Sequence, residues 1–222
     1  MIGFQIHQRS RAVDADTVKR FKELPVANVS DMMSRMYAGG ANLRPMHDGT
    51  YMAGPAVTVR CRPGDNLLVH KALEVAGPGD VIVVDAGGDL TNAIIGEIMV
   101  AYAQKRGLAG IVIHGAIRDS AEIGRGSFPV FAAGVTHRGP YKDGPGEINS
   151  TICLGGMTIQ PGDLIIGDAD GLLCVPFEIT QEVYKQTVEK HVIEEKMLAD
   201  IDAGTYDASW VDMRLKALGC LF

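Results

Sequence analysis

The chain has 222 residues, of which 46% are hydrophobic and 22% are charged. These fractions are close to globular averages, and a body of this length buries about 70% of the surface that its unfolded chain exposes. Wholesale disorder is therefore excluded, and the chain needs neither disulfides nor a structural metal in order to fold. The net charge is −6 and no long basic run offsets it, which argues against a nucleic-acid partner.

The cysteines and the apolar runs bear on the compartment in which the protein works. Cys61, Cys153, Cys174 and Cys220 form no CxxC or Cys/His cluster, so neither a zinc ribbon nor a redox pair is predicted. The first residues turn polar too soon for a signal peptide, and every apolar run is shorter than the ~20 residues that span a bilayer. We therefore expect a cytoplasmic protein with reduced thiols and no membrane partner.

Helical and alternating patterns share the first third of the chain. Residues 14–24 combine apolar residues at helical spacing with early acidic and later basic residues, and Pro25 ends this predicted helix. A second helix is predicted over 28–37, with Asn28 or Ser30 as its N-cap. Further along, we predict a strand over 52–62 and a helix over 66–76.

Short apolar runs in the centre predict a sheet that is buried on both faces. Residues 81–84 (VIVV) and 110–114 (GIVIH) have the pattern of such strands, and a third short strand is predicted over 128–132. A helix over 93–106 lies between the first two strands in this prediction. This alternation of strands and helices is typical of an α/β fold with a mostly parallel, helix-covered sheet.

The last part of the chain changes character. Residues 163–176 predict two strands around an acidic glycine turn, followed by a long helix over 179–202 and a short one over 210–218. The long helix is amphipathic and charged. Its apolar stripe packs either on the protein's own core or on a neighbouring subunit, and the sequence leaves both alternatives open.

The tripeptide Pro-Gly-Asp occurs three times, at residues 63–65, 78–80 and 161–163. The last two copies precede the similar strands VIVVDAGG and LIIGDADG. Pro and Gly favour tight turns because proline presets one backbone angle and glycine adopts conformations closed to other residues. We interpret the repeat as one convenient turn used three times rather than as an internal duplication.

Candidate functional residues follow two of the predicted central strands, where ligands bind in α/β sheets. The predicted helix start over 93–99, which contains Gly96 and Glu97, offers backbone N–H groups to an anion, although helix packing explains a lone glycine there equally well. Arg118 and Asp119 form an adjacent pair of opposite charges after a glycine turn. A guanidinium suits a substrate carboxylate and a single carboxylate suits Mg²⁺. Alternatively, Asp119 is the N-cap of the next helix and Arg118 makes a surface ion pair.

The segment from Gly96 to Asp119, GEIMVAYAQKRGLAGIVIHGAIRD, resembles the signature of the class II 4-hydroxy-4-methyl-2-oxoglutarate aldolase family. That family shares its fold with the regulator of ribonuclease activity A. The resemblance runs from about Pro25 to Pro176, and the C-terminal extension is similar to that of the aldolases rather than the shorter regulators. It implies a swivelling β/β/α domain (RraA-like) with N- and C-terminal helical extensions. One domain would cover residues 1–222, with a core over 25–176, an extension over 177–222 and a homotrimer or homohexamer as the assembly.

The resemblance also implies roles for particular residues. Arg118 would contact a 2-oxo acid, and Asp119 would be the direct protein ligand to Mg²⁺ or Mn²⁺. Glu97 stands where aspartate is expected in the aldolases and would position a catalytic water. A neighbouring subunit would add a glutamate from its C-terminal helix, either Glu194 or Glu195. The substrate carboxylate would be held by the backbone amides of Gly96, Glu97, Ile98 and Met99.

The implied function is a metal-dependent carbon–carbon lyase. Its substrate would be 4-hydroxy-4-methyl-2-oxoglutarate or a similar 4-carboxy-2-oxo acid, cleaved to pyruvate, and decarboxylation of oxaloacetate would be a chemically natural side activity. The competing hypothesis is a non-catalytic protein-binding regulator like the ribonuclease inhibitors. The intact Gly96-Glu97 and Arg118-Asp119 pairs favour the enzyme.

Overall fold

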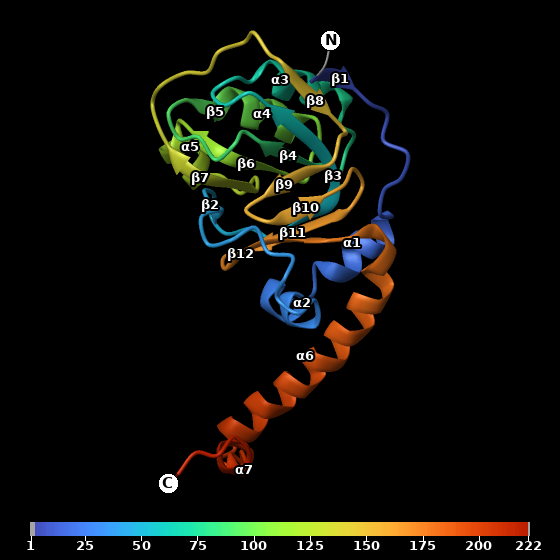
Figure 1. Ribbon diagram of the computed structural model, residues 1–222, viewed down its shortest axis with the longest axis vertical. Helices are drawn as coiled ribbons and strands as arrows, with labels where there is room; N and C mark the ends of the chain where they lie inside the picture. Colours follow the sequence, from blue (N-terminus) through green and yellow to red (C-terminus); the bar gives the residue numbers. More distant parts are fainter. Residues whose placement is uncertain (1–2, 222) are drawn as a thin grey trace.

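The computed structural model describes residues 3–221 and shows a layered body from which one long helix extends (Figure 1). The centre is a parallel sheet in the order β3-β4-β6-β7, with strands that point the same way because helices carry the chain back between them. These four strands are β3 (Met52–Cys61), β4 (Val81–Asp85), β6 (Gly110–Ile117) and β7 (Val130–Val135).

Smaller strands extend this sheet and make it mixed. β8 (Gly146–Ile148) and β11 (Leu164–Asp168) both pair antiparallel with the long strand β3, β11 along its first half and β8 near its end. The others are β1 (Phe4–Ile6), β2 (Arg44–Pro45), β5 (Ala93–Ile95) and β12 (Gly171–Val175), whereas β9 (Ile152–Leu154) and β10 (Met157–Ile159) form a separate hairpin.

The helices cover the strands on two opposite sides. α3 (Leu67–Val75), α4 (Glu97–Lys105) and α5 (Ser120–Arg125) belong to the side that carries β5. The other side holds α1 (Ala15–Phe21), α2 (Val26–Met32) and the first part of α6 (Thr180–Asp202), with a short 3-10 turn at Phe177–Ile179. α7 (Ser209–Ala217) lies at the far end of α6, away from the body (Figure 1).

Three clusters of buried apolar side chains hold the layers together. The residues VIVV of β4 belong to two of these clusters. Ile82 and Val84 pack toward α3 and α4, whereas Val81 and Val83 pack on the opposite face against β9, β10 and β12. Because side chains alternate along a strand, a strand covered on both faces needs apolar residues at every position. The third cluster joins β11 and β12 to α1, α2 and α6. The prediction of an α/β fold is confirmed, with a helix–sheet–sheet–helix order of layers.

The structure corrects two predicted helices. Residues 93–95 form β5 rather than the start of a helix, because Ala93 and Ile95 pair with the end of β6, and α4 begins only at Glu97. Residues 28–37 were predicted as a helix with Asn28 or Ser30 as N-cap, but α2 begins after Pro25 and ends at Met32. Ser34 and Arg35 have positive φ angles, which a helix cannot continue through.

The strand lengths differ from prediction in the same region. β6 runs to Ile117 rather than to 114, and β7 covers 130–135 rather than 128–132. Both extensions arise from tertiary pairing, since the ends of β6 and β7 pair with each other beyond a register shift. Among residues 3–221, no helix has the length and apolar character needed to cross a membrane.

All three Pro-Gly-Asp copies form turns in which glycine has a positive φ and aspartate is buried. Gly64, Gly79 and Gly162 have φ angles of 75°, 84° and 88°. Asp65 and Asp163 each accept backbone hydrogen bonds from two different segments, and these carboxylates are almost completely buried. The repeat is therefore one turn with a carboxylate that joins neighbouring segments, as interpreted from the sequence.

Candidate active site

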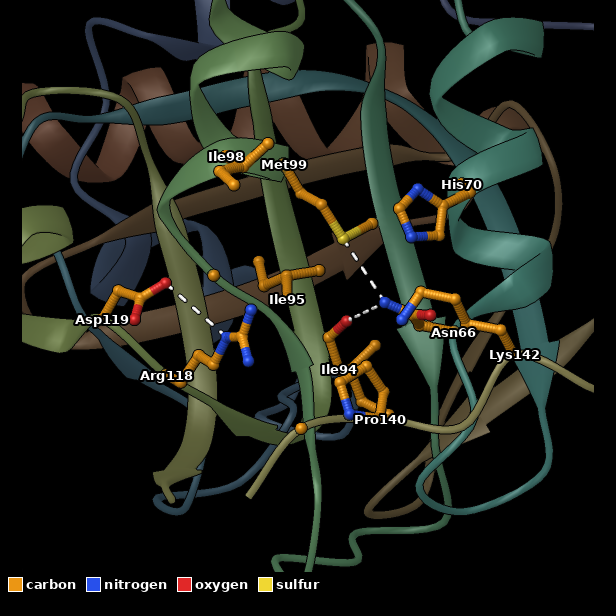
Figure 2. Close-up of a pocket in the computed structure, with 12 residues that line it drawn as sticks. Asn66, His70, Ile94, Ile95, Ile98, Met99, Arg118, Asp119, Pro140 and Lys142 are labelled. Atoms are coloured by element: carbon orange, nitrogen blue, oxygen red, sulfur yellow. Dashed lines mark hydrogen bonds and ion pairs between the residues drawn. The ribbon is translucent and has the colours of Figure 1, made fainter. Parts of the chain in front are cut away.

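A cavity of about 230 Å³ lies where β5, β6 and the start of α4 meet, beside the loop at 139–142. Figure 2 shows Arg118 and Asp119 on one side of it, and His70, Asn66 and Lys142 on the other, with Ile95 and Met99 between them. The remaining lining residues are Ile94, Gly96, Ile98, Gly139 and Pro140. The sequence prediction of a ligand site after these strands therefore coincides with an open cavity.

Arg118 and Asp119 sit where β6 ends. The Arg118 backbone N–H donates to the Ile95 carbonyl, which ties this end to β5. Asp119 has a φ of 56°, a left-handed conformation that aspartate tolerates better than most residues, and this turn brings both side chains to the cavity. The Arg118 Nε lies 3.7 Å from the Asp119 Oδ2, and both side chains are more than a third exposed. The two charges therefore remain available to a ligand.

The Asp119 carboxylate caps a different helix from the one that the sequence suggested. It precedes α5 but makes no capping bond to that helix. Instead, Asp119 Oδ2 accepts a hydrogen bond of 3.0 Å from the backbone N–H of Glu97 at the start of α4. Asp119 does occupy the N-cap position of α5, as the alternative predicted, but its side chain is used at the start of α4 instead. The contact joins the two candidate motifs, 22 residues apart, into one site.

Gly96 permits this close approach. A Cβ at this position would lie 2.3 Å from Asp119 Oδ2 and 3.0 Å from Arg118 Cγ, which is closer than real Cβ contacts. The backbone of Gly96 is extended (φ −146°), so any residue could adopt it and space alone selects glycine. The glycine is therefore explained by its contact with Asp119 and Arg118 in the site, and not by the packing of one helix on another.

The first backbone amides of α4 are only partly free. The Glu97 N–H donates to Asp119, and the Met99 N–H donates to the Gly96 carbonyl at 3.1 Å. The Ile98 N–H has no acceptor among residues 3–221. A ligand carboxylate at this helix start would therefore find Ile98 as the free first-turn donor, with the partial positive charge of the helix N-terminus behind it.

The Glu97 side chain lies outside the cavity. It lines a neighbouring groove between α4 and α5 together with Glu122, Gln104 and Phe128. The backbone of Glu97 contributes to the site through its N–H, whereas its carboxylate is exposed on the other side of the helix start. The role of this carboxylate in positioning a water stays a prediction.

The opposite wall of the cavity holds three polar residues that the sequence analysis did not select. Asn66 is buried, and its Nδ2 donates to the Ile94 carbonyl at 2.8 Å while its Oδ1 has no partner. His70 is on the next turn of α3, and its pKa is lowered by burial and by the nearby Lys142 cation. A neutral imidazole and an ammonium group thus lie opposite Arg118 across the cavity, whereas the Asn66 Oδ1 is buried. No local motif marks them, because Lys142 comes from a distant loop.

Glu194 and Glu195 are far from this cavity within one chain. Both lie on α6, which packs on the side of the double sheet layer opposite to α4 (Figure 1). Glu194 accepts a hydrogen bond of 2.7 Å from Asn28 Nδ2 and pairs with Lys190. Glu195 is more exposed and lies 3.7 Å from His191. Either glutamate can therefore reach such a cavity only in another copy of the chain.

The donor set at Asp119 suits a weakly held divalent cation. Asp119 Oδ1 has no hydrogen-bond partner among the described residues, and the carboxylate opens onto the cavity. In that part of the chain, no group of three or more His, Cys, Asp or Glu side chains is placed to hold a metal. Mg²⁺ often binds through one or two carboxylates while keeping waters and substrate oxygens, so the site fits Mg²⁺ or Mn²⁺ and not a closed zinc centre.

Comparison with known proteins agrees with this fold. The profile of the RraA-like family described as Aldolase/RraA matches residues 26–174, so the chain belongs to that family. A relative from Halalkalibacterium halodurans, named "Putative 4-hydroxy-4-methyl-2-oxoglutarate aldolase", is 39% identical over 182 residues, which cover 82% of this chain and 87% of the relative.

Two solved structures show the same fold. Streptomyces coelicolor RraAS2, described as an unusual member of the RNase ES inhibitor RraA family, has a TM-score of 0.75 and 27% identity, and the match covers 83% of this chain and 96% of that one. A Thermus protein described as the RNA-processing inhibitor RraA has a TM-score of 0.63 and 33% identity, with 68% and 92% covered. The resemblance noted from Gly96 to Asp119 is thus confirmed at the level of family.

Proposed function

We propose that this protein is a divalent-metal-dependent lyase that cleaves a 4-carboxy-2-oxo acid such as 4-hydroxy-4-methyl-2-oxoglutarate and releases pyruvate. The observation that carries this proposal is the joining of Gly96, Arg118 and Asp119 in one open cavity by the hydrogen bond from Glu97 to Asp119. A purely structural pair would not need two charged, half-exposed side chains at the end of a buried strand.

The chemistry needs positive charge where the 2-oxo group becomes negative. A divalent cation held by Asp119 supplies a Lewis acid at that group when it is bound. The Arg118 guanidinium faces the same cavity and donates hydrogen bonds to the developing negative oxygen from a fixed position. The free Ile98 N–H at the start of α4 binds the neighbouring carboxylate of the substrate.

The opposite wall suits the second carboxylate of such a substrate. Lys142 supplies a positive charge there, and neutral His70 supplies a ring nitrogen for hydrogen bonding. Asn66 supports this wall through the hydrogen bond from its Nδ2 to the Ile94 carbonyl, while its Oδ1 is buried.

The proton of the C4 hydroxyl group leaves as the carbon–carbon bond breaks, so a base or a held water is required. We assign the holding of this water to Glu194 or Glu195 of a neighbouring copy, because the Glu97 carboxylate lies outside the cavity of its own chain. The exposed apolar residues on the outer part of α6 fit this assembly, which we propose to be a trimer or a pair of trimers. They are Val192, Ile193, Met197, Leu198 and Ile201.

The direct test measures pyruvate release from 4-hydroxy-4-methyl-2-oxoglutarate and from oxaloacetate. EDTA should abolish release and added Mg²⁺ or Mn²⁺ should restore it. Asp119→Asn is the informative variant, because asparagine tolerates the left-handed backbone and keeps an acceptor for the Glu97 N–H while losing the charge. This variant should stay folded, and it should release no pyruvate even when Mg²⁺ or Mn²⁺ is added. Full activity in EDTA after dialysis would contradict the proposal.

The shared site is tested by mixing two inactive variants, Asp119→Ala and the double variant Glu194→Ala with Glu195→Ala, after dissociation and reassembly. If the site is built from two copies, some mixed interfaces contain a complete set of residues and activity reappears. Mixed assemblies that stay inactive would contradict the contribution of a second copy. A protein with no lyase activity on either substrate would instead favour the non-catalytic regulator; the Thermus relative is described as an RNA-processing inhibitor.

A further inference from the structure

A cluster of polar side chains joins α2 to α6 around the carboxylate of Glu194. Asn28 Nδ2 donates to Glu194 Oε2 at 2.7 Å, and the Lys190 ammonium group bonds to Glu194 Oε1. Lys190 also lies 3.2 Å from Asp31 Oδ2 on α2. Both oxygens of the Glu194 carboxylate are therefore held, one from each helix.

This arrangement exceeds what the packing of α2 on α6 requires. Asn28 is only 7% exposed, and a buried amide is unfavourable unless it is hydrogen-bonded. The same contact made with apolar residues would join the helices without that cost. Glu195, the adjacent carboxylate, shows the contrast, since its side chain is 66% exposed and has only His191 nearby at 3.7 Å.

The held carboxylate faces open space. A groove of about 440 Å³ on the outer surface of α2 and α6 is lined by Glu194 and Lys190 together with the apolar side chains of Met32, Ile193 and Met197. Gln186 and Glu189 also line this groove, which therefore places apolar side chains and charged groups beside the held Glu194 carboxylate.

We propose that Asn28 and Lys190 are positioning residues that fix the Glu194 carboxylate, and not Glu195, for the active site of a neighbouring copy. This inference rests on the proposed shared site. A carboxylate on an exposed helix samples several rotamers, and fixing it in advance removes that cost when the neighbouring cavity binds substrate. Lys190 and Asn28 touch neither substrate nor metal and act through Glu194 alone.

The charges around Glu194 define a pH signature. The Lys190 hydrogen bond is the main cause that holds the pKa of Glu194 below its usual range, with a smaller contribution from Asn28, while burial and Asp31 oppose it. His191 faces Asn28 from the same helix, and Arg35 pairs with Asp31 from α2. Removing Lys190 raises the pKa of Glu194, so any step that needs the ionised carboxylate loses activity at a higher pH than before.

The experiment compares four variants by kcat and KM across the acid range, with the assembly checked by light scattering. Glu194→Gln tests the glutamate itself, Lys190→Met and Asn28→Ala test its positioning, and Lys190→Arg tests rescue by a similar donor. Lys185→Met removes the same charge from an exposed position one and a half turns earlier on α6 and serves as the control.

We expect Lys190→Met and Asn28→Ala to lower kcat on the order of tenfold with little change in KM, as for other residues that orient a functional group. Lys190→Met should also move the acid limb of kcat/KM to higher pH, whereas Lys190→Arg and Lys185→Met should not. Normal activity of Glu194→Gln would overturn the inference and leave Glu195 as the glutamate of the shared site. A damaged Glu194→Gln beside normal Lys190→Met and Asn28→Ala would contradict only the positioning. A loss of the assembly in either positioning variant would make the cluster an interface element and overturn the inference.

Discussion

At the scale of single residues, the site depends on the missing side chain of Gly96 and on the positive φ angle of Asp119. Gly96 leaves room for Asp119 Oδ2, which a Cβ would meet at 2.3 Å. Asp119 in turn adopts a positive φ that turns it back toward α4 rather than forward along α5. The two residues are 23 positions apart in sequence. Asp119 approaches so closely that only glycine fits at position 96, and the glycine leaves the space that the Asp119 carboxylate occupies.

The guanidinium of Arg118 is expected to act through its shape and not through charge alone. Arg118→Lys keeps the positive charge but loses the planar fork that binds two oxygens at once. We expect kcat/KM to fall at least about tenfold, which corresponds to about 1.4 kcal/mol of transition-state stabilisation. Steady-state kinetics of pyruvate release measures this loss. A Lys variant with unchanged kinetics would show that only the charge matters.

The four thiols should separate into two classes. Burial raises the pKa of Cys61 to about 12, and burial beside the Asp163 carboxylate also raises the pKa of Cys174. Cys153 and Cys220 are exposed. At pH 8 a thiol-specific reagent should therefore label two thiols per chain rapidly, and the other two only after denaturant is added. Rapid labelling of Cys61 or Cys174 in the native protein would contradict this assignment of burial.

At the scale of elements, the Pro-Gly-Asp turns hold segments that are distant in sequence. Asp80 pairs with Arg9 at 2.7 Å, and Asp163 pairs with Arg11 at 3.2 Å. Both arginines belong to the extended segment that follows β1. Two copies of the same turn therefore hold this segment against the starts of β4 and β11. The repeated tripeptide stabilises tertiary contacts in addition to forming a local turn.

Asp163→Ala should destabilise the fold without touching the active site. The substitution leaves the backbone N–H groups of Gln160 and Phe177 without their acceptor and removes one of the ion pairs of Arg11. We expect a loss of about 3 kcal/mol in the free energy of unfolding, because unsatisfied buried donors cost about 1–3 kcal/mol each. Urea denaturation measures it, with Glu23→Ala as an exposed control. A loss below 1 kcal/mol would mean that water replaces the carboxylate.

At the scale of the whole molecule, α6 has two halves with different tasks. Its first half packs on the protein's own core, where Val183 and Val188 contact the cluster that contains Phe21. Its second half and α7 expose large apolar side chains, including Trp210, along an arm that leaves the body (Figure 1). Packing on the protein's own core is thus confirmed for the first half of α6, whereas packing of the outer half on a neighbouring subunit stays a prediction.

Two truncations separate these tasks. A chain that ends at Glu189 should keep its fold and its thermal unfolding transition but lose the assembly, because it retains Val183 and Val188 and lacks the exposed arm. A chain that ends at Pro176 should also unfold at a clearly lower temperature, since the cluster around Phe21 loses its cover. Light scattering and calorimetry measure both effects. An intact assembly in the Glu189 truncation would place the interface elsewhere.

The sequence by itself determined the central strands, the Pro-Gly-Asp turns, the family and the motif from Gly96 to Asp119. These are local patterns or nearly contiguous ones, and the physical reasons for them lie within a few residues. Only the tertiary structure decided that residues 93–95 pair as a strand, because the partner β6 lies beyond α4 in the sequence.

The same limit applies to the site. Asp119 caps α4, the Glu97 side chain points away from the cavity, and Asn66, His70 and Lys142 form the opposite wall. The choice between α4 and α5 for Asp119 depends on which helix start the folded chain places against it, and the wall combines α3 with a loop about 70 residues later. Such juxtapositions arise from packing across layers, which leaves no periodic signal in the sequence.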